Sequence, residues 1–99
     1  MDEKLYNSLK QLGQRLKQSR IERGDTQKDF AFRIGISIPT LHKMEAGSPQ
    51  VAIGTWAIAL EMIGCESDLD KLIAPKRSLA ERFESEQRQA GRQRVKRRK

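Results

Sequence analysis

Apolar residues recur three or four positions apart along the first three quarters of the chain, as they do in helices with one buried face. No stretch alternates convincingly between apolar and polar residues as a half-buried strand does. The pattern predicts five helices, over residues 5–23, 27–34, 38–45, 53–63 and 67–73. In the first of these, Leu5, Leu9, Leu12 and Leu16 mark the expected inward face. The sequence therefore predicts an all-α fold.

The junction between the second and third helices is the most sharply defined part of the chain. Thr26 is expected to cap the helix over 27–34 by accepting a hydrogen bond from the backbone N–H of Asp29. Gly35 stands where a left-handed C-terminal cap needs a residue without a Cβ atom. Ser37 is expected to cap the next helix. The sequence thus predicts two short helices joined by a tight turn.

The same two helices divide their residues between an inward and an outward face. The inward residues are predicted to be Phe30, Ala31, Ile34, Ile36, Leu41 and Met44, and the outward ones Ile38, Pro39, Thr40, His42 and Lys43. Pro39 is tolerated in a first turn because the N–H groups there lack intrahelical acceptors, but it disfavours helical geometry at Ile38. This favours a start of the third helix one residue late.

This run resembles the helix-turn-helix of the Xre family, the phage lambda repressor and Cro type. The resemblance depends on Gln27, Ala31, Gly35-Ile36-Ser37 and Glu45-Ala46-Gly47, which stand in register with the family's pattern. It continues on both sides, through Leu12-Gly13, Leu16, Arg20 and Arg23-Gly24, and through Ile53-Gly54-Thr55-Trp56, Leu60 and Ile63-Gly64. The resemblance implies a five-helix, lambda-repressor-like DNA-binding fold.

The resemblance also implies which residues touch double-stranded DNA, with the third helix in the major groove. These are Gln27, Lys28, Ser37, Ile38, Pro39, Thr40, His42 and Lys43. Gln27 would bind a backbone phosphate through its side-chain amide and the helix N-terminus. Ile38 and Pro39 depart from the polar residues that the family often has there. Specificity would then depend on apolar contacts to thymine methyls, on Lys43 at guanine and on DNA shape.

Two further expectations come from the family. Arg20 and Glu45 occupy the positions of an ion pair that would lock the end of the third helix against the first helix. Two copies should bind a palindromic operator, because one short helix reads too few base pairs. We expect the homodimer to form through the fourth and fifth helices, with Leu69, Leu72 and Ile73.

The net charge of +7 is concentrated at the end of the chain. Residues 1–74 carry ten basic and ten acidic side chains, whereas residues 75–99 carry ten basic and three acidic ones. We therefore expect a DNA-binding domain over 1–74 and a charged, partly disordered, basic C-terminal tail over 75–99. A short helix over 79–89 is also compatible with the tail sequence, although its apolar residues alone cannot anchor it without a partner.

Composition speaks against several classes of protein. His42 and Cys65 are the only residues of their kinds, so no metal site and no disulfide framework are expected. The sequence contains no nucleophile–base constellation, so we expect neither an enzyme nor a cofactor. No apolar run approaches membrane-spanning length and the first residues lack a secretory apolar region, which predicts a cytoplasmic protein without membrane contact.

The C-terminal tail leaves a second function open. Short Xre proteins with a charged extension resemble HipB-type antitoxins, which bind a kinase-like toxin and repress their own operon. A basic arm can equally be a tether to DNA phosphates. The sequence is compatible both with a dimeric transcriptional repressor and with an antitoxin that has a toxin protein as its partner.

Overall fold

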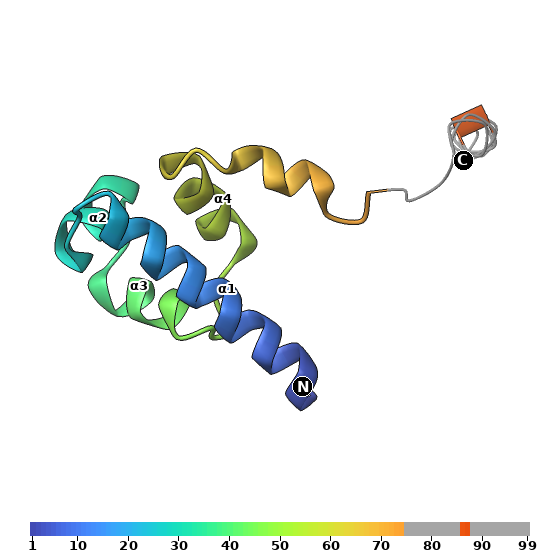
Figure 1. Cartoon of the computed structure of the whole chain (residues 1–99), viewed down its shortest axis with the longest axis horizontal. Coiled ribbons are helices and arrows are strands. Elements are labelled where there is room, and N and C mark those ends of the chain that lie inside the picture. The colour runs from blue at the N-terminus through green and yellow to red at the C-terminus, as the bar shows by residue number, and fades with distance from the viewer. Residues whose placement is uncertain (75–85, 88–99) are drawn as a thin grey trace, which may run out of the picture.

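The computed structural model describes residues 1–74 and 86–87. Four α-helices and one 3-10 helix follow one another along the chain: α1 (Glu3–Glu22), α2 (Gln27–Ile34), α3 (Ile38–Glu45), α4 (Ile53–Met62) and η1 (Glu66–Lys71) (Figure 1). The described residues contain no strand. The all-α class with five helices is therefore confirmed. Of the possible helix over 79–89, the structure describes only residues 86–87, which are helical, and the end of the tail lies outside the described residues.

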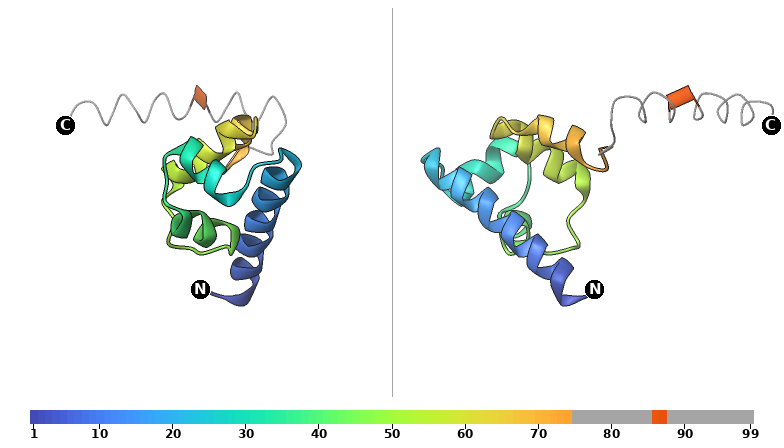
Figure 2. Two further views of the ribbon diagram at one scale, coloured as in Figure 1. Left: turned by 90° about the vertical axis from the view of Figure 1, so that its left-hand side faces the viewer. Right: turned by 45° about the vertical axis from the view of Figure 1, so that its right-hand side comes forward.

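The long helix α1 supports α3, and α3 in turn contacts α2. It packs mainly against α3, while α2 packs against both α3 and α4, and η1 packs against α4. Figures 1 and 2 show α2 near the C-terminal end of α1, α3 beside its middle, and the N-terminus projecting beyond the bundle. The α2–α3 pair thus lies at one side of the domain and α4 with η1 at another.

The predicted turn between α2 and α3 is confirmed in its details. The Thr26 hydroxyl accepts a hydrogen bond from the Asp29 backbone N–H at 3.0 Å. Gly35 ends α2 in the left-handed conformation, with φ of 73°, where a side chain would be strained. The Ser37 hydroxyl accepts from the Thr40 backbone N–H at 3.2 Å and so caps α3. Local capping therefore fixes both ends of the turn.

Three expectations about the helices need correction. The expectation that the third helix starts one residue late is wrong. α3 begins at Ile38, with Pro39 in its first turn. The Ser37 cap holds this turn in place, and the N–H that Pro39 lacks has no acceptor within the helix at that position. The fifth helix is a 3-10 helix that ends before Leu72. Leu5 is 56% exposed, because it lies on the part of α1 that extends beyond its neighbours.

The core lies between α1, α2, α3 and α4. Its buried members are Leu16, Phe30, Ala31, Ile34, Leu41, Met44 and Ala59, and Ile36, Val51, Trp56, Met62 and Ile63 pack against them. All six residues predicted to face inward from the helix pair belong to this set. Trp56 is half-buried, so part of it packs on the core. The pattern of α2 and α3 was thus sufficient to identify their buried faces.

A close approach of backbones sets the distance between α1 and α3. A Cβ atom added to the buried Gly13 of α1 would stand 2.5 Å from the carbonyl oxygens of Met44 and Glu45. At Gly47, just after α3, an added Cβ would stand 2.6 Å from backbone atoms of Lys10. Both contacts are with backbone, which cannot move aside as a flexible side chain does. The seam between α1 and α3 therefore requires glycine on both sides.

We predict that Gly13→Ala destabilises the domain by about 1–3 kcal/mol or more, because the methyl group would force α1 away from α3. Gly54→Ala is the matched control, since Gly54 is also helical but has open space around its Cβ position. The control should leave the free energy of unfolding unchanged or raise it by up to about 1 kcal/mol. Urea denaturation of both variants measures the difference. Equal stability of the two would contradict the close approach.

Candidate nucleic-acid interface

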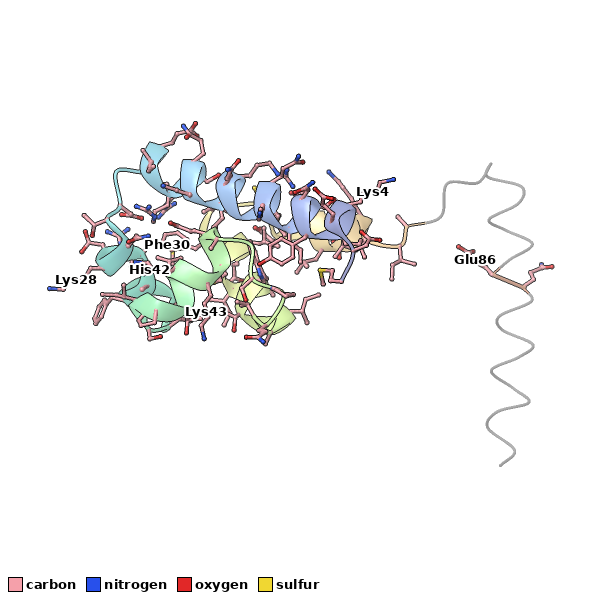
Figure 3. The ribbon with its side chains drawn as sticks, turned by 90° about the horizontal axis from the view of Figure 1, so that it is seen from below. Lys4, Lys28, Phe30, His42, Lys43 and Glu86 are labelled. Atoms are coloured by element: carbon pink, nitrogen blue, oxygen red, sulfur yellow. The ribbon has the colours of Figure 1, made fainter. Side chains whose placement is uncertain are left out.

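The residues expected to contact DNA line the outward side of the α2–α3 pair. Lys28, Ser37, Ile38, Pro39, His42 and Lys43 are exposed, while Gln27 and Thr40 are half-buried. Figure 3 shows Lys28 and Lys43 extending away from the two helices, whereas Phe30 lies inside the domain. The fold therefore leaves six of these eight side chains open to solvent and holds the other two partly within the domain.

A buried ion pair fixes the end of α3 to α1. The Arg20 guanidinium donates from Nε to Glu45 Oε2 at 2.7 Å and from Nη2 to Glu45 Oε1 at 3.2 Å. Its Nη1 donates to the Asp25 backbone carbonyl at 2.9 Å. The two side chains are only 8% and 6% exposed. A bidentate contact fixes the relative orientation of the two side chains as well as their distance. The ion pair implied by the family resemblance is therefore present, and it orients α3.

Glu45 also connects this pair to Gln27, the expected phosphate-binding residue. Gln27 Nε2 donates to Glu45 Oε1 at 3.0 Å, and Gln27 Oε1 lies 2.7 Å from His42 Nε2. Four side chains from three helices therefore form one continuous network, in the order Arg20, Glu45, Gln27 and His42. The sequence indicated each of these residues but gave no signal for the two contacts of Gln27, which join positions 18 and 15 residues apart.

The hydroxyl groups at the start of α3 are engaged with each other. Ser37 Oγ lies 2.8 Å from Thr40 Oγ1, in addition to accepting the Thr40 backbone N–H. These bonds hold the first turn of the helix in shape. Ser37 and Thr40 consequently have less hydrogen-bonding capacity left for DNA than two free hydroxyls would have.

Asp25 is a structural residue that the sequence interpretation missed. It is 8% exposed, and its carboxylate accepts from Arg23 Nε at 3.1 Å and lies 3.5 Å from Arg33 Nη1. Arg23 in turn donates from Nη1 to the Met62 backbone carbonyl at 3.1 Å. Asp25 thereby ties the end of α1 to α2. The available signal was an acidic residue between Gly24 and the cap Thr26, with Arg23 two positions before it.

The expected dimer residues lie around and after η1. Leu69 is half-buried, while Leu72 and Ile73 are 59% and 102% exposed. Leu69 and Leu72 border a hollow of about 560 Å³ between the first half of α1, the loop before α4, α4 and η1. Apolar members of its lining include Leu9, Leu12, Val51, Ile53, Trp56 and Leu60. This side of the domain therefore offers apolar surface beyond the three predicted residues.

Metal-binding clusters and membrane-spanning helices were two further features to look for in the described residues. Among residues 1–74 and 86–87, no group of three or more His, Cys, Asp or Glu side chains is placed to hold a metal ion. Within the same residues, no helix combines the length and the apolar character needed to cross a membrane.

Comparison with known proteins identifies the helix pair. A family model described as a helix-turn-helix domain matches residues 11–72, well over half of the chain. The chain belongs to this helix-turn-helix family. The matched region contains α2, α3, α4 and η1 complete and most of α1. Membership implies DNA binding and a part in transcriptional regulation, and such domains typically belong to non-enzymatic regulators. No curated protein and no solved structure matches the chain.

The buried pair of the helix-turn-helix domain gives a prediction on stability. Arg20→Met should lower the free energy of unfolding by about 3 kcal/mol, because Glu45 would remain buried with only the Gln27 amide as its partner. Adding Glu45→Leu should restore part of this loss, since the second substitution removes the uncompensated charge. Lys17→Met is the control, because Lys17 is exposed on the same helix and should change little. Simple additivity of the two substitutions in urea melts would contradict the coupling.

Proposed function

We propose that this protein is a sequence-specific transcriptional regulator of the Xre type, a repressor that binds a palindromic operator in double-stranded DNA as a homodimer. The observation that carries the proposal is the presentation of α3. Its outward face is exposed, and its C-terminal end is fixed to α1 by the buried Arg20–Glu45 pair. A short helix held rigidly in this way can enter the major groove without having to be ordered by DNA.

The exposed residues of α3 contact the bases, and the residues at the start of α2 contact the DNA backbone. Lys43 reads guanine from the major groove, and Ile38 and Pro39 contact thymine methyl groups. Gln27 and Lys28, at the beginning of α2, bind the DNA backbone and set the orientation of the protein. With few free polar groups in the first turn of α3, the shape of the DNA contributes to the choice of site.

The second copy of the chain covers the apolar surface beside η1. Leu69, Leu72 and Ile73 contact their counterparts, and the adjoining hollow supplies further apolar area. Residues 51–74 carry four acidic side chains and one basic side chain, so this region suits a protein contact better than a phosphate contact. The dimer represses by occluding the promoter in which its operator lies.

Selection of bound duplexes from a random pool tests the function directly. The enriched sequences should form a palindrome whose two half-sites are about one turn of DNA apart. Mapping this consensus upstream of the gene itself would identify regulated promoters. A pool that yields no enriched sequence would overturn the proposal of a specific regulator, and a consensus without two-fold symmetry would overturn the homodimer.

We predict that Lys43→Ala weakens binding to the selected operator more than binding to random duplex. A lost base contact costs about 1–3 kcal/mol of binding free energy. Random duplex mostly lacks the matching base, so binding to it should lose less. Lys4→Ala is the control with the same change of charge, since Lys4 lies at the far end of α1 (Figure 3). Fluorescence anisotropy titrations measure both affinities. If Lys43→Ala weakens both DNAs equally, Lys43 contacts phosphate instead.

The alternative is a HipB-type antitoxin that binds a kinase-like toxin and autoregulates its operon. The feature that favours it is the basic tail, in which residues 91–99 carry six basic and no acidic side chains. In the repressor, these charges attract DNA of any sequence. In the antitoxin, they bind a protein. An adjacent reading frame for a kinase-like protein would favour the antitoxin.

Deletion of residues 91–99 distinguishes the two functions. If the tail binds DNA, the slope of log affinity against log salt should flatten by about 2–4 units, because each neutralised phosphate contributes about 0.9. Operator and random duplex should weaken alike, and the preference for the operator should survive. An unchanged slope would show that the tail does not touch DNA, and would favour the antitoxin.

A further inference from the structure

The side-chain amide of Gln27 is held at both of its ends. Its nitrogen donates to Glu45 Oε1 at 3.0 Å, and its oxygen lies 2.7 Å from His42 Nε2. Glu45 is itself held in place, because Arg20 donates two hydrogen bonds to the same buried carboxylate. The position of the Gln27 amide is therefore set by an immobile partner on one side and by His42 on the other.

Hydrogen-bond chemistry determines which way round this amide lies. The ionised carboxylate of Glu45 only accepts, so the atom of Gln27 that faces it must be the nitrogen. The amide oxygen then faces His42, and since this oxygen also only accepts, His42 Nε2 must carry a hydrogen. An amide turned by half a rotation would place its oxygen against the Glu45 carboxylate, and it would keep the His42 contact only if the ring moved its hydrogen to Nδ1. The network thus admits a single orientation of Gln27.

This orientation matters for an anion. The amide nitrogen has two hydrogens, of which Glu45 receives one, so the second remains for a further acceptor. Were the amide free to turn, its oxygen would in part of the population face a phosphate and repel it. Resting on the proposed function, we infer that His42 is a positioning residue, which orients the Gln27 amide so that its N–H points to a DNA phosphate. His42 acts through Gln27 and does not itself read the sequence.

The test compares two replacements of His42 that have similar length and no charge. His42→Gln keeps an N–H donor that can reach the Gln27 oxygen, and His42→Met does not. His42→Met should weaken binding to operator and random duplex alike by about tenfold, the effect of one lost hydrogen bond to a charged group. His42→Gln should bind within about twofold of the unchanged protein. Because His42 is exposed, the urea midpoint of both variants should stay the same.

A double-mutant cycle separates positioning from a direct contact. Gln27→Ala should weaken binding in the unchanged protein, but should have little further effect when His42→Met is already present. Full additivity of the two losses would overturn the inference, and so would equal binding by the Met and Gln replacements. A loss confined to the operator would also overturn it, since His42 would then contact a base.

Measurements on the free protein keep this inference distinct from the function itself. In NMR spectra, the two amide protons of Gln27 should have chemical shifts displaced from those of a free glutamine and should exchange slowly with water. Both properties should move towards those of a free glutamine in His42→Met but not in His42→Gln. If the unchanged protein bound no duplex, the proposed function would fail while these signals still tested the contact. Identical Gln27 signals in both variants would overturn the inference even if DNA binding were normal.

Discussion

The buried pair between Arg20 and Glu45 is the interaction on which the presentation of α3 depends. It joins the last turn of α1 to the last residue of α3, and its two hydrogen bonds fix an angle as well as a distance. A buried pair of this kind contributes little net stability compared with apolar residues of the same shape. Its value here is geometric, because an apolar contact in the same place would not define the direction in which α3 points.

A helix of eight residues such as α3 is not stable on its own in water, so the rest of the domain has to supply its order. The Ser37 cap fixes the first turn of α3, and the buried Leu41 and Met44 form its inner face. Gly13 allows α1 to approach the last carbonyl groups of α3. Each of these contacts acts on a different part of the helix. Together they leave only the outward face free, which is the face that a DNA-binding helix must offer.

The parts of this structure that follow from nearby residues could be predicted from the sequence. The Thr26 and Ser37 caps, the left-handed Gly35 and the buried face of α2 depend on spacings of a few residues. The contacts of Gln27 could not be predicted, because they depend on how two helices cross. The exposure of Leu5 likewise depends on the absence of a neighbour over the first turns of α1, which its helical spacing cannot reveal.

The outward surface of α3 differs from one with free polar side chains at the start of the helix. The Ser37 cap and the network around Gln27 explain the difference. The hydroxyl groups of Ser37 and Thr40 are hydrogen-bonded to each other, and the side chains of Ile38 and Pro39 have no polar group. In the proposed function, polar contact with DNA is therefore shifted to Lys43 in the second turn and to Gln27 on the neighbouring helix. Gln27 is bonded to Glu45, which is in turn bonded to Arg20 of α1. The proposed binding of the DNA backbone by Gln27 is therefore physically coupled to the packing of α1 against α3.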